Sequence, residues 1–171
     1  RHFLMQVSIL GCGWLGLPLA QLLLEEGYII KGSTTTPTKL GLLKGAGVEP
    51  FLIALRDAGP EGDIALFLEG SDVLIIDVPP KVRSGENYVQ KMKHLLPHIE
   101  KAGIKKVLFI SSTSVYADDN TVVTEETTPV PDTESGKQLL QAEELLQDNP
   151  NFKSTILRFG GLIGEDRHPV Y

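Results

Sequence analysis

The chain has 171 residues, of which 42% are hydrophobic and 22% are charged, and its formal net charge is -6. This length and balance predict one soluble globular domain, and the acidic charge without a basic run argues against a general nucleic-acid surface. The single cysteine, Cys12, excludes an internal disulfide and suits a cytoplasmic protein. No apolar run reaches the ~18 residues that a membrane span needs.

Apolar runs of strand length alternate with longer helical patterns, which predicts an α/β fold with a doubly wound parallel sheet. We expect strands at residues 6–10, 28–32, 51–54, 73–78, 107–110 and 155–159, and helices at 14–26, 38–45, 64–69, 87–101 and 134–147. Residues 59–62 and 118–131 are expected to be loops. Ligands of such sheets bind where the strands end, so the loops that follow the strands should surround one crevice.

A glycine-rich turn, GCGWLG at residues 11–16, joins the first strand to the first helix. Gly11 permits the sharp turn, Gly13 leaves room for a pyrophosphate, and Gly16 lets the helix pack close to the strand. The free amides and the dipole at the start of the helix favour an anion there. We therefore assign these glycines, with Trp14 and Leu15, to a dinucleotide site.

The segment after the second strand indicates which dinucleotide the site takes. An NAD site usually carries Asp or Glu about 20 residues after the glycines, where it binds the ribose 2′-hydroxyl. Residues 31–39 contain no acid, and their hydroxyls and lysines can bind a 2′-phosphate. We assign Ser33, Thr34, Thr35 and Lys39 to the cofactor site, so NADP is favoured over NAD; the alternative is an exposed polar loop.

Further cofactor contacts are expected where the fourth and fifth strands end. Val78, Pro79 and Pro80 follow the fourth strand, and Ser111 ends the fifth, so these residues should line the same crevice. Asp77 ends an otherwise apolar strand. It is either a functional acid with a raised pKa or a carboxylate that accepts hydrogen bonds from loop amides.

Several motifs follow the glycine turn in order: SSTSVY at residues 111–116, EETTP at 125–129, AEEL at 142–145 and LRFGGLIG at 157–164. With the glycine turn, they make the chain resemble the extended short-chain dehydrogenase/reductase superfamily, in its NAD-dependent epimerase/dehydratase branch. The resemblance implies a Rossmann domain that binds NAD(P), and an oxidoreductase, epimerase or dehydratase for a small hydroxylated or nucleotide-sugar-like substrate. It also implies a C-terminal substrate-binding region, so residues 5–171 are interpreted as an NAD(P)-binding domain without its C-terminal end.

The resemblance also implies catalytic positions. Ser112 matches the family's Ser or Thr that hydrogen-bonds the substrate oxygen, whereas the family's helical Tyr and Lys positions fall on Ser135 and Leu139. No tyrosine occurs between Tyr116 and Tyr171, so this helix cannot supply the usual phenol. We keep Ser112 and Ser135 as the candidate catalytic residues of an atypical member. Lys137 lies two residues from Ser135, on the wrong side of the helix for pairing.

Two other readings of the function stay open. A chain that kept the dinucleotide turn but lost the Tyr–Lys pair fits a non-catalytic sensor or scaffold. The Val78-Pro79 pair after the fourth strand also suggests a β-hydroxyacid dehydrogenase-like enzyme. The expected partners are a dinucleotide and a small molecule, with a homodimer left open. His94 and His98 are four residues apart but lack an evident third ligand, so no metal site is expected.

Overall fold

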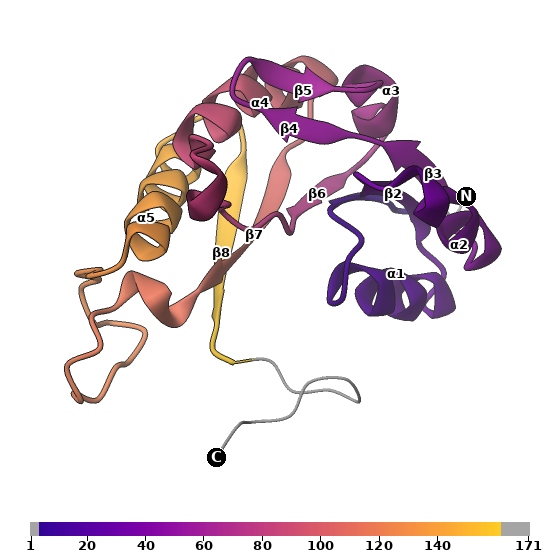
Figure 1. Ribbon diagram of the computed structural model, residues 1–171. Helices are drawn as coiled ribbons and strands as arrows, with labels where there is room; N and C mark the ends of the chain where they lie inside the picture. Colours follow the sequence, from indigo (N-terminus) through magenta and orange to yellow (C-terminus); the bar gives the residue numbers. More distant parts are fainter. Residues whose placement is uncertain (1–3, 162–171) are drawn as a thin grey trace.

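The computed structural model describes residues 4–161, and its centre is a six-stranded sheet (Figure 1). The strands are β1 (Gln6–Leu10), β2 (Ile29–Thr34), β3 (Glu49–Leu52), β6 (Val73–Ile76), β7 (Lys106–Ser112) and β8 (Lys153–Phe159). Their order across the sheet is β3-β2-β1-β6-β7-β8, and every neighbouring pair is parallel. The predicted doubly wound α/β fold is confirmed. The chain adds strands toward one edge from β1 to β3 and toward the other edge from β6 to β8, so the order of the strands switches between β1 and β6.

Helices cover both faces of this sheet (Figure 1). One face carries α1 (Gly16–Glu25) and α2 (Leu40–Gly45), and the other carries α3 (Ile64–Leu68), α4 (Tyr88–Ala102) and α5 (Glu134–Gln147). Short 3-10 turns, η1 (Pro37–Lys39), η2 (Val82–Ser84) and η3 (Thr113–Val115), lie in the connections. The long helices are capped as their sequences suggest, because Asn87 accepts from the Gln90 amide and Thr133 from the Gly136 amide. None of the helices among residues 4–161 is long and apolar enough to cross a membrane.

The alternation of the strands divides the core into two clusters. Ile9 and Ile75 belong to the cluster beneath α1 and α2, whereas Leu10, Ile76 and Phe109 belong to the cluster beneath α3, α4 and α5. Side chains of successive strand residues point to opposite faces, so one apolar strand supplies both clusters. All five side chains are almost completely buried, which fixes the strand ends that carry the site.

A small antiparallel hairpin, β4 (Ala54–Arg56) and β5 (Gly59–Glu61), corrects the expected loop at residues 59–62 and the expected strand at 51–54. Gly59 and Gly62 have φ angles of 133° and 105°, which suit glycine, and a Cβ at Gly62 would lie 2.2 Å from the Leu52 carbonyl oxygen. Leu55 is buried in the core, so the hairpin is anchored to the domain by an apolar side chain. A three-residue strand that contains proline and glycine carries too little pattern for prediction.

Candidate functional site

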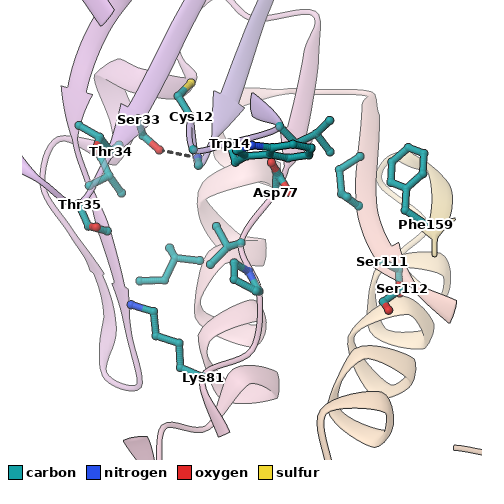
Figure 2. Close-up of a pocket in the computed structure, with 18 of the residues that line it drawn as sticks. Cys12, Trp14, Ser33, Thr34, Thr35, Asp77, Lys81, Ser111, Ser112 and Phe159 are labelled. Carbon is teal, nitrogen blue, oxygen red and sulfur yellow. Dashed lines mark hydrogen bonds between the residues drawn. The ribbon is translucent and has the colours of Figure 1, made fainter. Parts of the chain in front are cut away.

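An open cavity of about 620 Å³ lies at the carboxyl ends of the strands (Figure 2). It is lined by the glycine turn, the end of β2 and the loop after β6, and it extends to the ends of β7 and β8. The lining includes the predicted residues Gly11, Gly13, Trp14, Leu15, Ser33, Thr34, Thr35, Lys39, Val78, Pro79, Ser111 and Ser112. Gly16 and Pro80 are not among the lining residues, which also include Lys81 and Phe159.

The three glycines of the turn have three different environments. Gly11 has a φ of +98°, and a Cβ there would lie 2.3 Å from the Asp77 carbonyl oxygen. A Cβ at Gly16 would lie 2.2 Å from the Gly11 carbonyl oxygen, so α1 packs directly on the turn. A Cβ at Gly13 would meet nothing within 4 Å, because this residue faces the open cavity. This space above Gly13 and the start of α1 fits the pyrophosphate of a dinucleotide.

Ser33, which lines the cavity, also fixes the turn. Its hydroxyl oxygen accepts a 2.9 Å hydrogen bond from the Gly11 amide (Figure 2). Its carbonyl oxygen accepts a 2.8 Å bond from the Cys12 amide. The side chain of Cys12 is buried beside Gly32, where a Cβ would lie 2.6 Å from the sulfur. Burial raises the pKa of Cys12 to about 12, so the thiol is a packing group and not a nucleophile.

The end of the cavity beside β2 carries threonine hydroxyls and lysine ammonium groups. Thr34 ends β2, Thr35 and Thr36 follow it, and Lys39 belongs to the 3-10 turn after them. Lys81, after β6, extends toward this end of the cavity (Figure 2). The sequence analysis missed Lys81, although its position just after the two prolines that end the strand was a usable signal.

Asp77 is the one carboxylate among the described residues that line the first cavity. It follows β6, its amide donates a 2.9 Å hydrogen bond to the Leu10 carbonyl, and its side chain lies near the glycine turn and Trp14 (Figure 2). Burial raises the pKa of Asp77 above its ordinary value. The same negative charge contributes to the raised pKa of Cys12 and, after burial, to that of Tyr88.

A buried polar network lies beside the ends of β7 and β8. The carboxylate of Glu143, on α5, is completely buried and accepts a 2.6 Å bond from the Ser111 hydroxyl. The Nη2 of Arg158 donates to the same carboxylate at 2.6 Å and its Nε donates at 3.1 Å, while its Nη1 donates to the Tyr116 hydroxyl at 2.6 Å. Hydrogen bonding to Glu143 raises the pKa of Arg158, so the guanidinium stays charged.

The sequence carried a signal for this network that was not used. Leu139, Ala142 and Leu146 form the buried face of α5, and Glu143 is on that face by helical spacing. A charged residue on an apolar helix face needs a partner, and Arg158, near the end of β8, supplies it.

A second cavity, of about 600 Å³, adjoins the first. Ser112, Gly160 and Gly161 line both cavities, so the two meet at the end of β7. The second cavity is also lined by Tyr116, by Thr133 and by the polar segment at residues 117–121. The Ser112 hydroxyl oxygen accepts a 3.1 Å bond from the Ser114 amide, which orients it at the start of η3.

Ser135 and Leu139, the α5 positions that match the family's Tyr and Lys, line neither cavity. Ser135 is half-buried in the first turn of α5 and lines neither cavity. Leu139 is 4% exposed and belongs to the apolar core, against which Tyr116 also packs. Among the described residues, no group of three His, Cys, Asp or Glu side chains could hold a metal ion. Ser135 as a catalytic residue therefore stays a prediction.

Comparison with known proteins supplies the family. A family model described as NAD(P)H-binding matches residues 11–171. The chain belongs to this family. This NAD(P)H-binding chain is 36% identical to Protein YeeZ of Escherichia coli K12 over 168 residues, which are 96% of the chain and 61% of the relative.

Solved structures share the fold of this NAD(P)H-binding chain. UDP-N-acetylglucosamine 4-epimerase from Bacillus cereus matches 98% of it with a TM-score of 0.77 at 17% identity, and the match spans 57% of that protein. UDP-glucuronic acid 4-epimerase from Bacillus cereus in complex with NAD matches 96% with a TM-score of 0.75 at 22% identity, spanning 60% of that protein. The chain thus has the fold of these two epimerases and spans about 60% of the length of the relatives it matches.

Proposed function

We propose that this protein is an NAD(P)-dependent oxidoreductase or epimerase/dehydratase of the extended short-chain type, for a hydroxylated or nucleotide-sugar-like substrate. The observation that carries the proposal is the continuity of the two cavities at Ser112. A dinucleotide over Gly13 and a substrate beside Tyr116 would meet at this hydroxyl. The bound nicotinamide would accept or supply the hydride.

The residues of this chain would position the reactants. The turn at residues 11–16 would hold the pyrophosphate, and Val78 and Pro79 would lie along the dinucleotide. Ser112 would hydrogen-bond the substrate oxygen that is oxidised or reduced. The hydroxyls of Thr34 and Thr35, with the nearby lysines, support NADP over NAD, because an ammonium attracts a 2′-phosphate.

The first test is a titration of the full-length protein with NADPH and with NADH, followed by nicotinamide fluorescence and thermal unfolding. Binding to the folded state alone must raise the melting temperature. We expect both readouts to respond to NADPH at lower concentration than to NADH. If neither ligand binds at millimolar concentration, the glycine turn has a structural role only and the proposed function is wrong.

The second test is a panel of UDP-glucose, UDP-galactose and UDP-N-acetylglucosamine, each with NAD and NADP. The readouts are the near-ultraviolet absorbance of reduced nicotinamide and chromatography of the sugar products. This panel is chosen because the structural neighbours are named as UDP-sugar epimerases.

A non-catalytic dinucleotide sensor is the second candidate. It is favoured by the burial of Leu139 in the core and by the absence of Ser135 from the lining of both cavities. A sensor would bind NADPH and turn over none of the panel, so the two tests separate the candidates.

A further inference from the structure

We propose that Tyr116, held by Arg158, is the proton donor and acceptor for the substrate oxygen, in place of the Tyr–Lys pair absent from α5. The proposal rests on the proposed function and names a catalytic residue for it. Three observations carry it: the location of the described tyrosines, the direction of the hydrogen bond from Arg158, and the short turn between Ser112 and Tyr116.

The location of the tyrosines identifies one phenol. Tyr88 is 1% exposed, and its hydroxyl donates to the Val78 carbonyl, so it is part of the core. Tyr28 is half-buried immediately before β2 and lines neither cavity. Tyr116 lines the second cavity, and it is the one phenol that does so between residues 4 and 161.

The hydrogen bond from Arg158 orients the hydroxyl of Tyr116. A guanidinium has donors and no acceptor, so the phenol oxygen must accept the 2.6 Å bond from Nη1. The hydroxyl hydrogen is therefore directed to another acceptor. Within the described chain no acceptor for it is found, which leaves it available to a ligand in the second cavity.

Arg158 is itself held by two partners, Glu143 and Tyr116. Its bidentate bonds to the buried Glu143 carboxylate hold the guanidinium in one plane, and its Cζ lies 5.2 Å from the centroid of the Tyr116 ring. The positive charge is permanent under physiological conditions. It would stabilise the phenolate that remains after proton transfer, which is the role of the family's lysine.

The turn η3 places Ser112 and Tyr116 on the wall of the second cavity. Ser112 precedes this 3-10 turn and Tyr116 follows it, with the Tyr116 amide donating 3.0 Å to the Thr113 carbonyl. Both residues line the second cavity. A substrate oxygen placed between them would accept from one hydroxyl and exchange a proton with the other.

The step balances in the direction of reduction. A bound reduced nicotinamide would supply the hydride and Tyr116 would donate the proton, so that a carbonyl would become an alcohol. The phenolic O–H bond breaks as the new O–H bond forms, and the negative charge stays on Tyr116 beside Arg158. Because Arg158 cannot deprotonate, water in the cavity must return the proton to the phenolate.

The first part of the test measures the availability of the phenol without any substrate. Full-length protein is acylated with N-acetylimidazole, and each tyrosine is quantified by peptide mass spectrometry. We expect acylation of Tyr116, no acylation of the buried Tyr88, and acylation of both in urea. If Tyr116 is as protected as Tyr88 in the folded protein, no cavity ligand can reach the phenol and the inference is overturned.

The second part uses the UDP-sugar panel with Tyr116→Phe, and with Tyr28→Phe as the matched control. We expect Tyr116→Phe to lower kcat by about 100-fold or more, with NADPH affinity and melting temperature near those of the wild type. Tyr28→Phe should retain the wild-type kcat. Arg158→Met should lower kcat to a similar extent. Arg158→Lys should lower kcat less, because it keeps the positive charge that stabilises the phenolate of Tyr116.

The outcomes separate this inference from the proposed function. The inference alone is overturned if Tyr116→Phe retains the wild-type turnover, or if Ser135→Ala abolishes it instead. A wild type that binds NADPH but turns over none of the panel overturns the proposed catalysis and this inference with it. Failure to bind any dinucleotide overturns the proposed function at its first step.

Discussion

The guanidinium of Arg158 and the carboxylate of Glu143 form an ion pair with an Nη2–Oε1 distance of 2.6 Å and a completely buried acidic partner. Glu143 also accepts from Ser111, so one carboxylate joins α5 to the ends of β7 and β8. Ser111 lines the first cavity and Tyr116, the other partner of Arg158, lines the second. The network therefore fixes the boundary at which the two cavities meet.

Replacing Glu143 by Gln should destabilise the protein strongly. The change leaves a partly buried guanidinium without its counter-charge, and breaking a buried pair in this way costs about 3 kcal/mol. The free energy of unfolding from urea titration is the measurement. The matched control is Glu144→Gln on the exposed side of the same helix, expected within about 0.5 kcal/mol of wild type. Equal stability of the two variants would contradict a structural role for the pair.

Gly16 and Gly13 should separate packing from binding. Gly16→Ala places a methyl group 2.2 Å from the Gly11 carbonyl oxygen, so α1 must shift, at a cost of about 2 kcal/mol or more. Gly13→Ala meets nothing within 4 Å and should leave the melting temperature nearly unchanged. Its methyl group occupies the space above the turn, so NADPH affinity should fall about tenfold. Unchanged NADPH affinity in a folded Gly13→Ala variant would place the pyrophosphate elsewhere.

Much of this architecture could be predicted from local pattern. The alternation of apolar runs with helical stretches predicted the parallel sheet, and the turn at residues 11–16 predicted where the cavity begins. Such features depend on residues close together in the sequence. The hairpin of β4 and β5 could not be predicted in this way, because three-residue strands have no period and Leu55 is buried in a core cluster that also contains residues far along the chain.

The polar network shows the other limit of prediction from sequence. Glu143 and Arg158 are 15 residues apart on different elements, and Tyr116 is 42 residues from Arg158. Their pairing depends on how α5 packs on the sheet, which no local motif encodes. The helix face on which Glu143 lies predicts that a partner exists, but only the tertiary structure identifies it.

Asp77 should make stability fall as the pH rises. Burial raises the pKa of its carboxyl group in the folded protein, so the folded state binds more protons than the unfolded state above the ordinary pKa of 3.8. Unfolding free energy therefore declines from there up to the raised value. Asp77→Asn should be more stable than wild type at pH 7 and equal to it below pH 3.8, as measured by urea titration across pH. A constant difference at every pH would show that charge is not the cause.

Lys39 and Lys81 should distinguish NADPH from NADH. Both line the end of the first cavity that carries Thr34 and Thr35, and their ammonium groups would attract a 2′-phosphate that NADH lacks. Lys39→Met and Lys81→Met should each weaken NADPH binding about fivefold to tenfold, with NADH binding changed less than about twofold.

Lys44→Met is the matched control, because Lys44 belongs to α2 and does not line the cavity. Fluorescence titrations at two salt concentrations supply the measurement. Screening should weaken NADPH binding to the wild type more than to a variant that carries both Lys39→Met and Lys81→Met, since the attraction is between charges. If Lys39→Met and Lys81→Met weaken NADH and NADPH equally, the lysines contact a part common to both dinucleotides, and the preference for NADP has no basis in this loop.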